Sequence, residues 1–147
     1  MDIKTATDII EIQSLLARYV YAIDDKDFDQ LDTVFTSDAE IDYTATGGVR
    51  GQYAQIKPWL ARALAGFPRT QHLIGLPLIT LQGDTARART MLFNPMQPAS
   101  GPLFFCGATY ADELVRTPQG WRITRRTETD AWFKNPPEGG IVPPLEE

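Results

Sequence analysis

The chain has 147 residues, 43% of them hydrophobic, and carries 14 basic and 19 acidic side chains for a net charge of -5. This length suits one domain with its own core, and an acidic balance without a long Lys/Arg cluster argues against nucleic acid and anionic membranes as partners. The single histidine and single cysteine exclude an internal disulfide and argue against a His/Cys metal site, while the absence of a signal-peptide pattern and of a long apolar run makes the cytoplasm the expected location.

The segment from about residue 7 to residue 22 is predicted to form an amphipathic helix. Thr7 or Asp8 is its expected N-cap. Apolar residues at steps of three and four place one face of this helix in the core; they are Ile9, Ile12, Leu15, Leu16, Tyr19, Val20 and Ile23.

Two shorter helices and a strand are expected next. The acidic segment 24–27 reads as a tight joint to a second helix over 28–35, and alternation predicts a strand over 39–43. A third helix is predicted over 53–64. Pro58 lies inside it, so we expect a kink or a late start there.

From residue 70 onward the pattern changes to long β-type runs with turn signals between them. These runs cover 70–81, 85–94, 103–116 and 121–133. Helices followed by an antiparallel meander predict an α+β fold in which one curved antiparallel sheet wraps the helices. Residues 1–133 would form this domain, and the Pro/Gly-rich segment 134–147 would be an extended tail over the cavity mouth or a neighbouring subunit.

Asp24 and His72 are the candidate dyad. Asp24 continues the apolar stripe to the C-terminal end of the first helix, where the helix dipole disfavours a carboxylate, so it needs a hydrogen-bond donor. His72 begins a β-type run among apolar neighbours. An Asp/His pair would orient the imidazole and raise its basicity. The alternative interpretations are a solvated acidic joint for Asp24 and a core histidine bonded to backbone for His72.

Three further polar residues are expected at the same cavity. Tyr19 lies about one and a half helical turns before Asp24, so its hydroxyl is either a donor to a substrate or an ordinary core group. Strand alternation turns Asn94 inward. It also places Arg125 on the face of Trp121 and leaves Arg126 outside, a choice that a β-bulge would reverse.

The rest of the candidate lining is apolar and aromatic, which favours a compact, apolar cyclic substrate. The residues are Phe35, Ile41, Tyr43, Trp59, Leu92, Phe105 and Trp132.

This layout resembles the SnoaL-like branch of the nuclear-transport-factor-2-like fold over about residues 8–132. The resemblance is carried by Leu16-Ala17-Arg18-Tyr19, Ala22-Ile23-Asp24, the segment 31–43, Thr70-Gln71-His72, Gly83-Asp84-Thr85-Ala86 and Gly120-Trp121-Arg122-Ile123. The family includes polyketide cyclases, scytalone and bile-acid dehydratases, ketosteroid isomerase and a dehydrochlorinase. The resemblance implies a cone with a deep apolar pocket, a dyad at Asp24 and His72, a hydroxyl donor at Tyr19 and, less securely, a late-strand arginine at Arg125. Asn94 stands where the bile-acid dehydratase carries an acidic residue.

The expected function is a lyase without cofactor or metal, in which His72 removes a proton from carbon and Asp24 stabilises the imidazolium. Tyr19, with Arg125 or Asn94, would steady the developing negative charge, and the substrate would be a steroid, polyketide or aromatic compound. The alternatives are an isomerase or polyketide cyclase using the same residues, a ligand-binding domain without turnover, and a structural or assembly role in which the cavity is incidental. A homodimer or homotrimer through the open sheet face is expected.

Overall fold

The first helix is longer than its apolar stripe predicts. In the computed structural model, which describes residues 1–138 and 142–146, α1 spans Ile3–Asp24. Its N-cap is Asp2, whose carboxylate accepts a 2.7 Å hydrogen bond from the backbone N–H of Thr5, rather than Thr7 or Asp8. Lys26, at φ 57°, ends the helix in the left-handed region. Asp24 is therefore held at the C-terminal end of α1.

The second helix is shorter than predicted, and the third has the predicted bounds. A 3-10 helix, η1, covers Phe28–Thr33, and a second, η2, covers Thr44–Thr46. The helix α2 spans Tyr53–Leu64 with Pro58 inside it and begins at a reciprocal capping box between Gln52 and Gln55. The late start that Pro58 suggested is not found.

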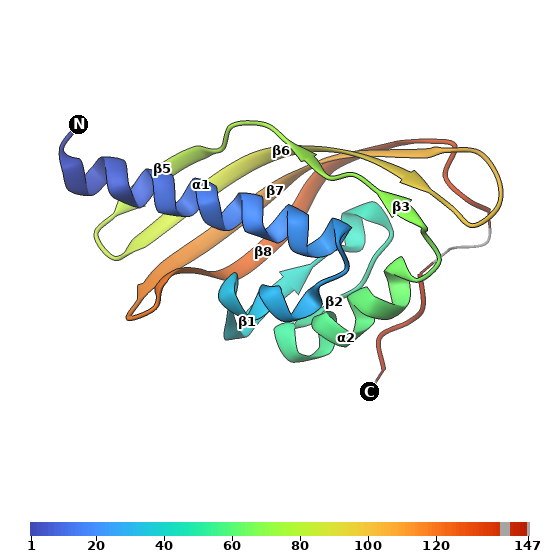
Figure 1. Ribbon diagram of the computed structural model, residues 1–147, viewed down its shortest axis with the longest axis horizontal. Helices are drawn as coiled ribbons and strands as arrows, with labels where there is room; N and C mark the ends of the chain where they lie inside the picture. The colour runs from blue at the N-terminus through green and yellow to red at the C-terminus, as the bar shows by residue number, and fades with distance from the viewer. Residues whose placement is uncertain (139–141, 147) are drawn as a thin grey trace.

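Eight strands form one curved, unclosed sheet in the order β2-β1-β8-β7-β6-β3, with β4 and β5 also paired to β6 (Figure 1). Their bounds are β1 Phe35–Asp42, β2 Arg50–Gln52, β3 Arg69–Thr70, β4 Leu73–Ile74, β5 Leu78–Gln82, β6 Thr85–Gln97, β7 Phe104–Thr117 and β8 Gly120–Lys134. The α+β class and the curved sheet are confirmed. The β1–β8 pair is parallel, so the sheet is not wholly antiparallel as predicted.

The expected single strand over 70–81 is divided into β3, β4 and β5. The backbone N–H of His72, in the gap between β3 and β4, donates to the Asp24 carboxylate at 2.8 Å instead of joining the ladder of β6. The same interaction that breaks the strand therefore brings His72 to the end of α1.

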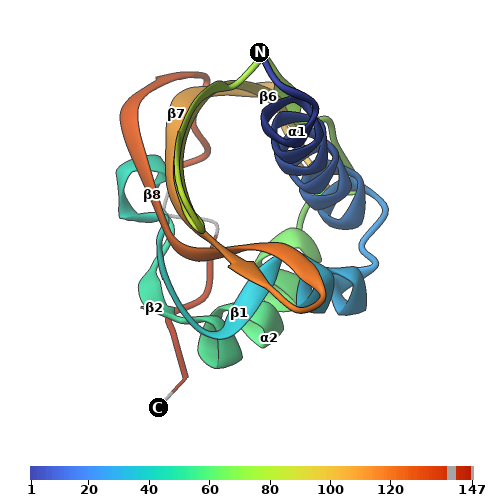
Figure 2. The same ribbon diagram turned by 90° about the vertical axis from the view of Figure 1, so that its left-hand side faces the viewer.

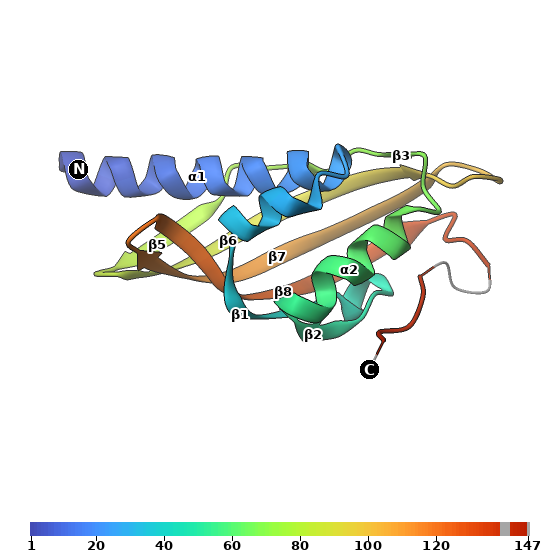
Figure 3. The same ribbon diagram turned by 60° about the horizontal axis from the view of Figure 1, so that its bottom comes forward.

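The helices cover the concave face of the sheet. Figure 2 shows β6, β7 and β8 curving as a trough, with α1 along its open side and α2 across the bottom. In Figure 3 the end of the chain runs beside α2. The buried faces of α1, α2 and the sheet meet in one apolar core. Within residues 1–138 and 142–146, no helix is both long enough and apolar enough to cross a membrane.

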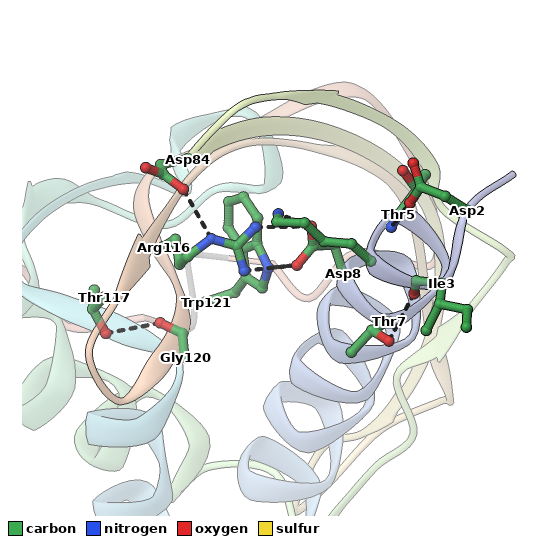
Figure 4. A network of polar contacts seen from close by, with 11 residues as sticks. Asp2, Ile3, Thr5, Thr7, Asp8, Asp84, Arg116, Thr117, Gly120 and Trp121 are labelled. Carbon is green, nitrogen blue, oxygen red and sulfur yellow. Dashed lines mark hydrogen bonds and ion pairs between the residues drawn. The ribbon is translucent and has the colours of Figure 1, made fainter.

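A buried carboxylate fastens the far end of α1 to the β7–β8 hairpin (Figure 4). Asp8, 4% exposed, accepts two hydrogen bonds from the Arg116 guanidinium at 2.7 and 2.8 Å. It also accepts one from the Trp121 indole at 3.1 Å and one from Lys4 at 3.0 Å. Arg116 donates in addition to Asp84 at 2.9 Å. These hydrogen bonds, above all those from Arg116, hold the pKa of Asp8 far below its usual range.

Asp8→Asn should lower the free energy of unfolding at neutral pH by about 2 kcal/mol, because a charged acceptor of four donors is lost. Since the pKa of Asp8 is lower in the folded protein, its contribution is present above the unfolded value of about 3.9 and is lost as the pH falls below it. Urea unfolding of wild type and variant should therefore converge in acid. Asp84→Asn, at an exposed partner of Arg116, is the control and should have a smaller effect.

Candidate active site

One apolar cavity of about 100 Å³ lies between the helices and the concave face of the sheet. Its wall comes from α1, α2, η2, the gap between β3 and β4, the three long strands and the end of the chain. The polar or titratable members are Tyr19, Tyr43, Thr46, His72, Asn94, Cys106, Tyr110 and Glu128. The remainder are Ile23, Gly48, Trp59, Leu60, Ala63, Leu64, Phe67, Leu92, Met96, Phe104 and Val142.

Asp24 and His72 meet at this cavity. The Asp24 carboxylate accepts hydrogen bonds from the Thr70 hydroxyl at 2.8 Å, from the backbone N–H of His72 at 2.8 Å and from Nδ1 of His72 at 2.6 Å. Burial raises the pKa of Asp24, but these three donors outweigh it and the net shift is downward. Asp24 is therefore an ionised acceptor, and Nδ1 of His72 carries a proton.

The other ring nitrogen of His72 faces Asn94 on β6. We orient the Asn94 amide so that its nitrogen donates to the carbonyls of Gln71 and Pro95, both at 3.3 Å, and its oxygen accepts from Nε2 of His72 at 3.1 Å. The opposite orientation would turn the amide oxygen towards two carbonyl oxygens. The side chains of Asp24 and Asn94 therefore hold the two ring nitrogens of His72 and fix the orientation of the imidazole at the cavity wall.

A pair of tyrosines stands in the same wall. The hydroxyls of Tyr19 and Tyr43 are 2.7 Å apart, and both side chains are buried. Burial raises the pKa of each phenol, so both keep their protons at neutral pH. One hydroxyl donates to the other, and one O–H remains available for a ligand oxygen.

A buried ion pair lies behind Tyr19. Arg126 donates to both oxygens of Asp112 at 2.7 Å, and neither side chain is exposed. The guanidinium lies 4.1 Å from the ring centre of Tyr19 and 3.9 Å from that of Tyr110, positions that favour cation–π attraction. Arg126 therefore fixes the Tyr19 ring without lining the cavity itself.

The expected inward orientation of Arg125 is wrong. Its side chain is 55% exposed and forms ion pairs with Glu40 at 3.1 Å and Glu113 at 3.9 Å. The register changes at Thr124, because Glu113 pairs with Arg125 while the next residue of β7 pairs with Ile123. This β-bulge reverses the alternation that Trp121 and Ile123 begin and turns Arg126 inward.

Four of the predicted lining residues do not reach the cavity. Phe105 and Trp132 are stacked with Phe93 at ring distances of 5.8 and 6.1 Å, on the outer face of the sheet. A second irregularity of β8 near Asp130, at φ 54°, turns Trp132 outward. Phe35 is buried but packs edge-on against Tyr19 at 5.9 Å. Ile41 is likewise buried in the core and outside the cavity wall, whereas Tyr43, Trp59 and Leu92 line it.

Sequence reasoning missed four polar residues of the wall. Thr46, Cys106, Tyr110 and Glu128 all line the cavity. The one available signal in the sequence was strand alternation, because Cys106 and Tyr110 are each two residues from Ala108 and so lie on the same face of β7 as that small apolar residue. Glu128 is two residues from Arg126 and lies on the same face of β8, so it points inward only because of the bulge at Thr124.

The end of the chain contributes to the wall of the cavity. Val142 lines it, and the indole N–H of Trp59 donates to the carbonyl of Pro143 at 2.7 Å. Arg62 donates to the carbonyl of Pro144 at 3.2 Å. The predicted tail is thus placed beside α2 at the cavity, while residues 139–141 and 147 lie outside the described residues.

Comparisons with known proteins agree on one fold. The uncharacterized protein Rv2910c of Mycobacterium tuberculosis is 47% identical over 136 residues, which cover 91% of this chain and 92% of that protein. The crystal structure of Kfla4162 from Kribbella flavida has a TM-score of 0.82 at 26% identity and covers 89% of this chain and 95% of its own. A type 2 hexachlorocyclohexane dehydrochlorinase (LinA) has a TM-score of 0.81 at 17% identity over 98% of this chain and 99% of its own.

The family match covers most of the described chain. The SnoaL-like domain matches residues 4–127, a range that holds nearly all of α1, all of α2, the Asp24–His72 pair and the first half of β8. The similar solved structures have the same helices packed on a curved sheet, as their TM-scores indicate. The chain belongs to the SnoaL-like domain family.

Proposed function

We propose that this protein is a cofactor-independent enzyme that moves a proton at a carbon atom of a small, apolar cyclic substrate, most simply in the β-elimination of water. The observation that carries the proposal is the 2.6 Å contact between Asp24 and His72 at the wall of an apolar cavity. A core histidine would need neither an ionised partner nor access to a cavity.

Each side chain at the site has a separate role in the proposed reaction. In its neutral form, His72 removes a proton from the carbon next to a substrate carbonyl through Nε2. Asp24 stabilises the resulting imidazolium through Nδ1–H, and the Asn94 oxygen accepts from the new Nε2–H. The free O–H of the Tyr19–Tyr43 pair donates to the carbonyl oxygen as negative charge develops there. Arg125 has no part in this scheme.

The cavity limits the substrate. At about 100 Å³ it is smaller than the roughly 150 Å³ apolar cavity that holds benzene. A single-ring substrate exceeds this volume by far less than a steroid does. We therefore favour a one-ring ketone over the steroid or fused polyketide that the apolar lining alone allowed.

Known proteins of this fold support elimination chemistry without deciding the substrate. LinA is a dehydrochlorinase, and a Novosphingobium aromaticivorans protein given provisionally as a scytalone dehydratase has a TM-score of 0.84 at 19% identity over 97% of both chains. Fold alone does not transfer an activity, so the proposal rests on the dyad.

The test is an assay of wild type and His72→Ala with 3-hydroxycyclohexanone and related hydroxy ketones, following loss of water by mass spectrometry. We expect the variant to lose about 10²- to 10⁴-fold in kcat/KM. An isomerised or cyclised product of unchanged mass would favour the isomerase or cyclase alternative. Binding without turnover, unaffected in His72→Ala, would favour a ligand-binding domain.

Asn94→Leu should lower kcat/KM by about tenfold or more. The leucine cannot form the 3.1 Å hydrogen bond to Nε2 of His72, so the ring loses one of the two side chains that orient it. The measurement is the kcat/KM of the variant with the same hydroxy ketones. An unchanged value would show that Asn94 does not orient the ring. Asn94→Asp is the control, because it keeps an oxygen acceptor at this position and should retain more activity than Asn94→Leu.

A further inference from the structure

Glu128 is the one carboxyl group in the described wall of the cavity. It lies on β8, directly opposite Tyr110 in the register of β7, and its residue is 8% exposed. Asp24, although it holds His72, is outside the lining. The scheme above gives Glu128 no role, yet a buried carboxyl group without an ion-pair partner is costly unless it is protonated or hydrogen-bonded.

The hydrogen bonds of Thr46 favour a protonated Glu128. The Thr46 hydroxyl oxygen lies within hydrogen-bond distance of both the Glu128 carboxyl and the carbonyl of Tyr43, the latter at 3.1 Å. A hydroxyl has one proton and cannot donate to both acceptors. Both contacts are satisfied when Thr46 donates to the Tyr43 carbonyl and the O–H of a neutral Glu128 donates to Thr46.

The charges around Glu128 agree with this arrangement. Burial raises the pKa of Glu128 to about 7, against the opposing effects of the Thr46 hydrogen bond and the Arg126 charge. Arg126 already donates hydrogen bonds to both carboxylate oxygens of Asp112. The titratable and charged groups that act on Glu128 or feel its charge are Asp42, Asp112, Arg126, Tyr19, Tyr43, Tyr110 and Cys106.

Glu128 and His72 lie in different parts of the cavity wall. His72 contacts Asn94 on β6, Glu128 lies on β8, and β7 runs between these strands. Asn94 pairs with Cys106 and Glu128 with Tyr110, four residues further along β7, so His72 and Glu128 face the one cavity from different ends and a ligand that fills it meets them at separate atoms. This separation is what an acid and a base acting on different atoms of one substrate require.

We propose that Glu128 is a second catalytic residue, which donates a proton to the leaving hydroxyl group of the substrate while His72 removes a proton from carbon. The inference rests on the proposed elimination and names its leaving group. The C–H electron pair becomes the new C=C bond, the C–O bond breaks with its electrons on oxygen, and that oxygen takes the Glu128 proton and leaves as water. Exchange with solvent returns a proton to Glu128 and removes one from His72.

The proposal predicts a dependence on the leaving group. Hydroxide leaves poorly unless it is protonated, whereas chloride leaves as the anion. Glu128→Gln keeps the size of the side chain and, through its NH₂ group, a donor to Thr46, but it carries no acidic proton. It should therefore lower kcat/KM for 3-hydroxycyclohexanone by about 10²-fold or more and that for 3-chlorocyclohexanone by less than about threefold. His72→Ala should slow both compounds, because proton removal from carbon is common to both.

The pH profile provides a second measurement that a purely structural role would not change. Turnover of the hydroxy compound should fall as the pH rises through the pKa of Glu128, and the chloro compound should show no such fall. The infrared band of a protonated carboxyl group should be present below about pH 7 in the unliganded wild type and absent in Glu128→Gln.

The outcomes separate the two proposals. If Glu128→Gln slows both compounds equally, or neither, or if the infrared band is missing, Glu128 is not the acid and the elimination by His72 still stands. If wild type turns over neither compound above the uncatalysed rate, the proposed function and this inference both fail. Circular dichroism and the thermal midpoint of Glu128→Gln verify that the fold is retained.

Discussion

Asp24→Asn should lower kcat/KM by about 10²- to 10⁴-fold. The carboxylate accepts from three donors, namely the Thr70 hydroxyl, the His72 backbone N–H and Nδ1–H of His72. An amide has one oxygen, so its NH₂ group must face at least one of these donors. The substitution also removes the negative charge that stabilises the imidazolium.

The neighbouring Asp25 is the matched control for this prediction. It is exposed and lies one residue beyond the end of α1, so Asp25→Asn makes the same chemical change outside the cavity. Its kcat/KM should remain within about twofold of wild type, since distant surface charges are screened. Equal activity of the two variants across the pH range would remove Asp24 from the mechanism.

Arg126→Met should lower the free energy of unfolding by about 3 to 5 kcal/mol. The substitution leaves Asp112 fully buried without its two 2.7 Å donors and withdraws a cation from the rings of Tyr19 and Tyr110. Because domains of this size have about 5 to 15 kcal/mol of stability in total, this is a large fraction. Urea unfolding followed by tryptophan fluorescence measures the loss.

Arg125→Met is the control that the bulge at Thr124 provides. The residue is adjacent and of the same type, but its side chain is 55% exposed and its ion pairs lie at the surface, where such pairs contribute about 0 to 1 kcal/mol. Similar losses for the two variants would contradict the assigned orientation. In the double variant Asp112→Leu with Arg126→Met, stability should partly recover, because no buried charge is then left unpaired.

The parts of the fold that depend on local sequence were predictable. The helix α2 has its predicted bounds because the capping residues at Gln52 and Gln55 and the Trp59–Leu60 stripe are all local signals. The Asp24–His72 pairing could be proposed because the helix end and the lone histidine are both visible in the chain. The break of the 70–81 run was not visible, since it follows from a hydrogen bond between residues 48 positions apart.

The predictions of side-chain orientation that failed depend on backbone irregularities and on burial. Trp132 was placed in the cavity for its aromatic character and lies instead on the outer face of the sheet. Strict alternation from Trp121 placed Arg125 inward, and one extra residue at Thr124, which no side-chain pattern predicts, turned it outward. Glu128 was missed for the same reason. Its acid–base character also depends on burial and on the position of Thr46, 82 residues away in the chain, so composition carried no sign of it.

The attachment of the chain end to α2 has a consequence for how the specificity of such a protein can change. Trp59 and Arg62 bind backbone carbonyls, those of Pro143 and Pro144, and a backbone carbonyl accepts a hydrogen bond whatever the side chain of its residue. Val142 reaches the cavity from the same segment. A replacement at Val142 can therefore reshape the space available to a ligand while both anchors and the Asp24–His72 pair stay in place, which makes this position a starting point for changing which ligands the cavity accepts.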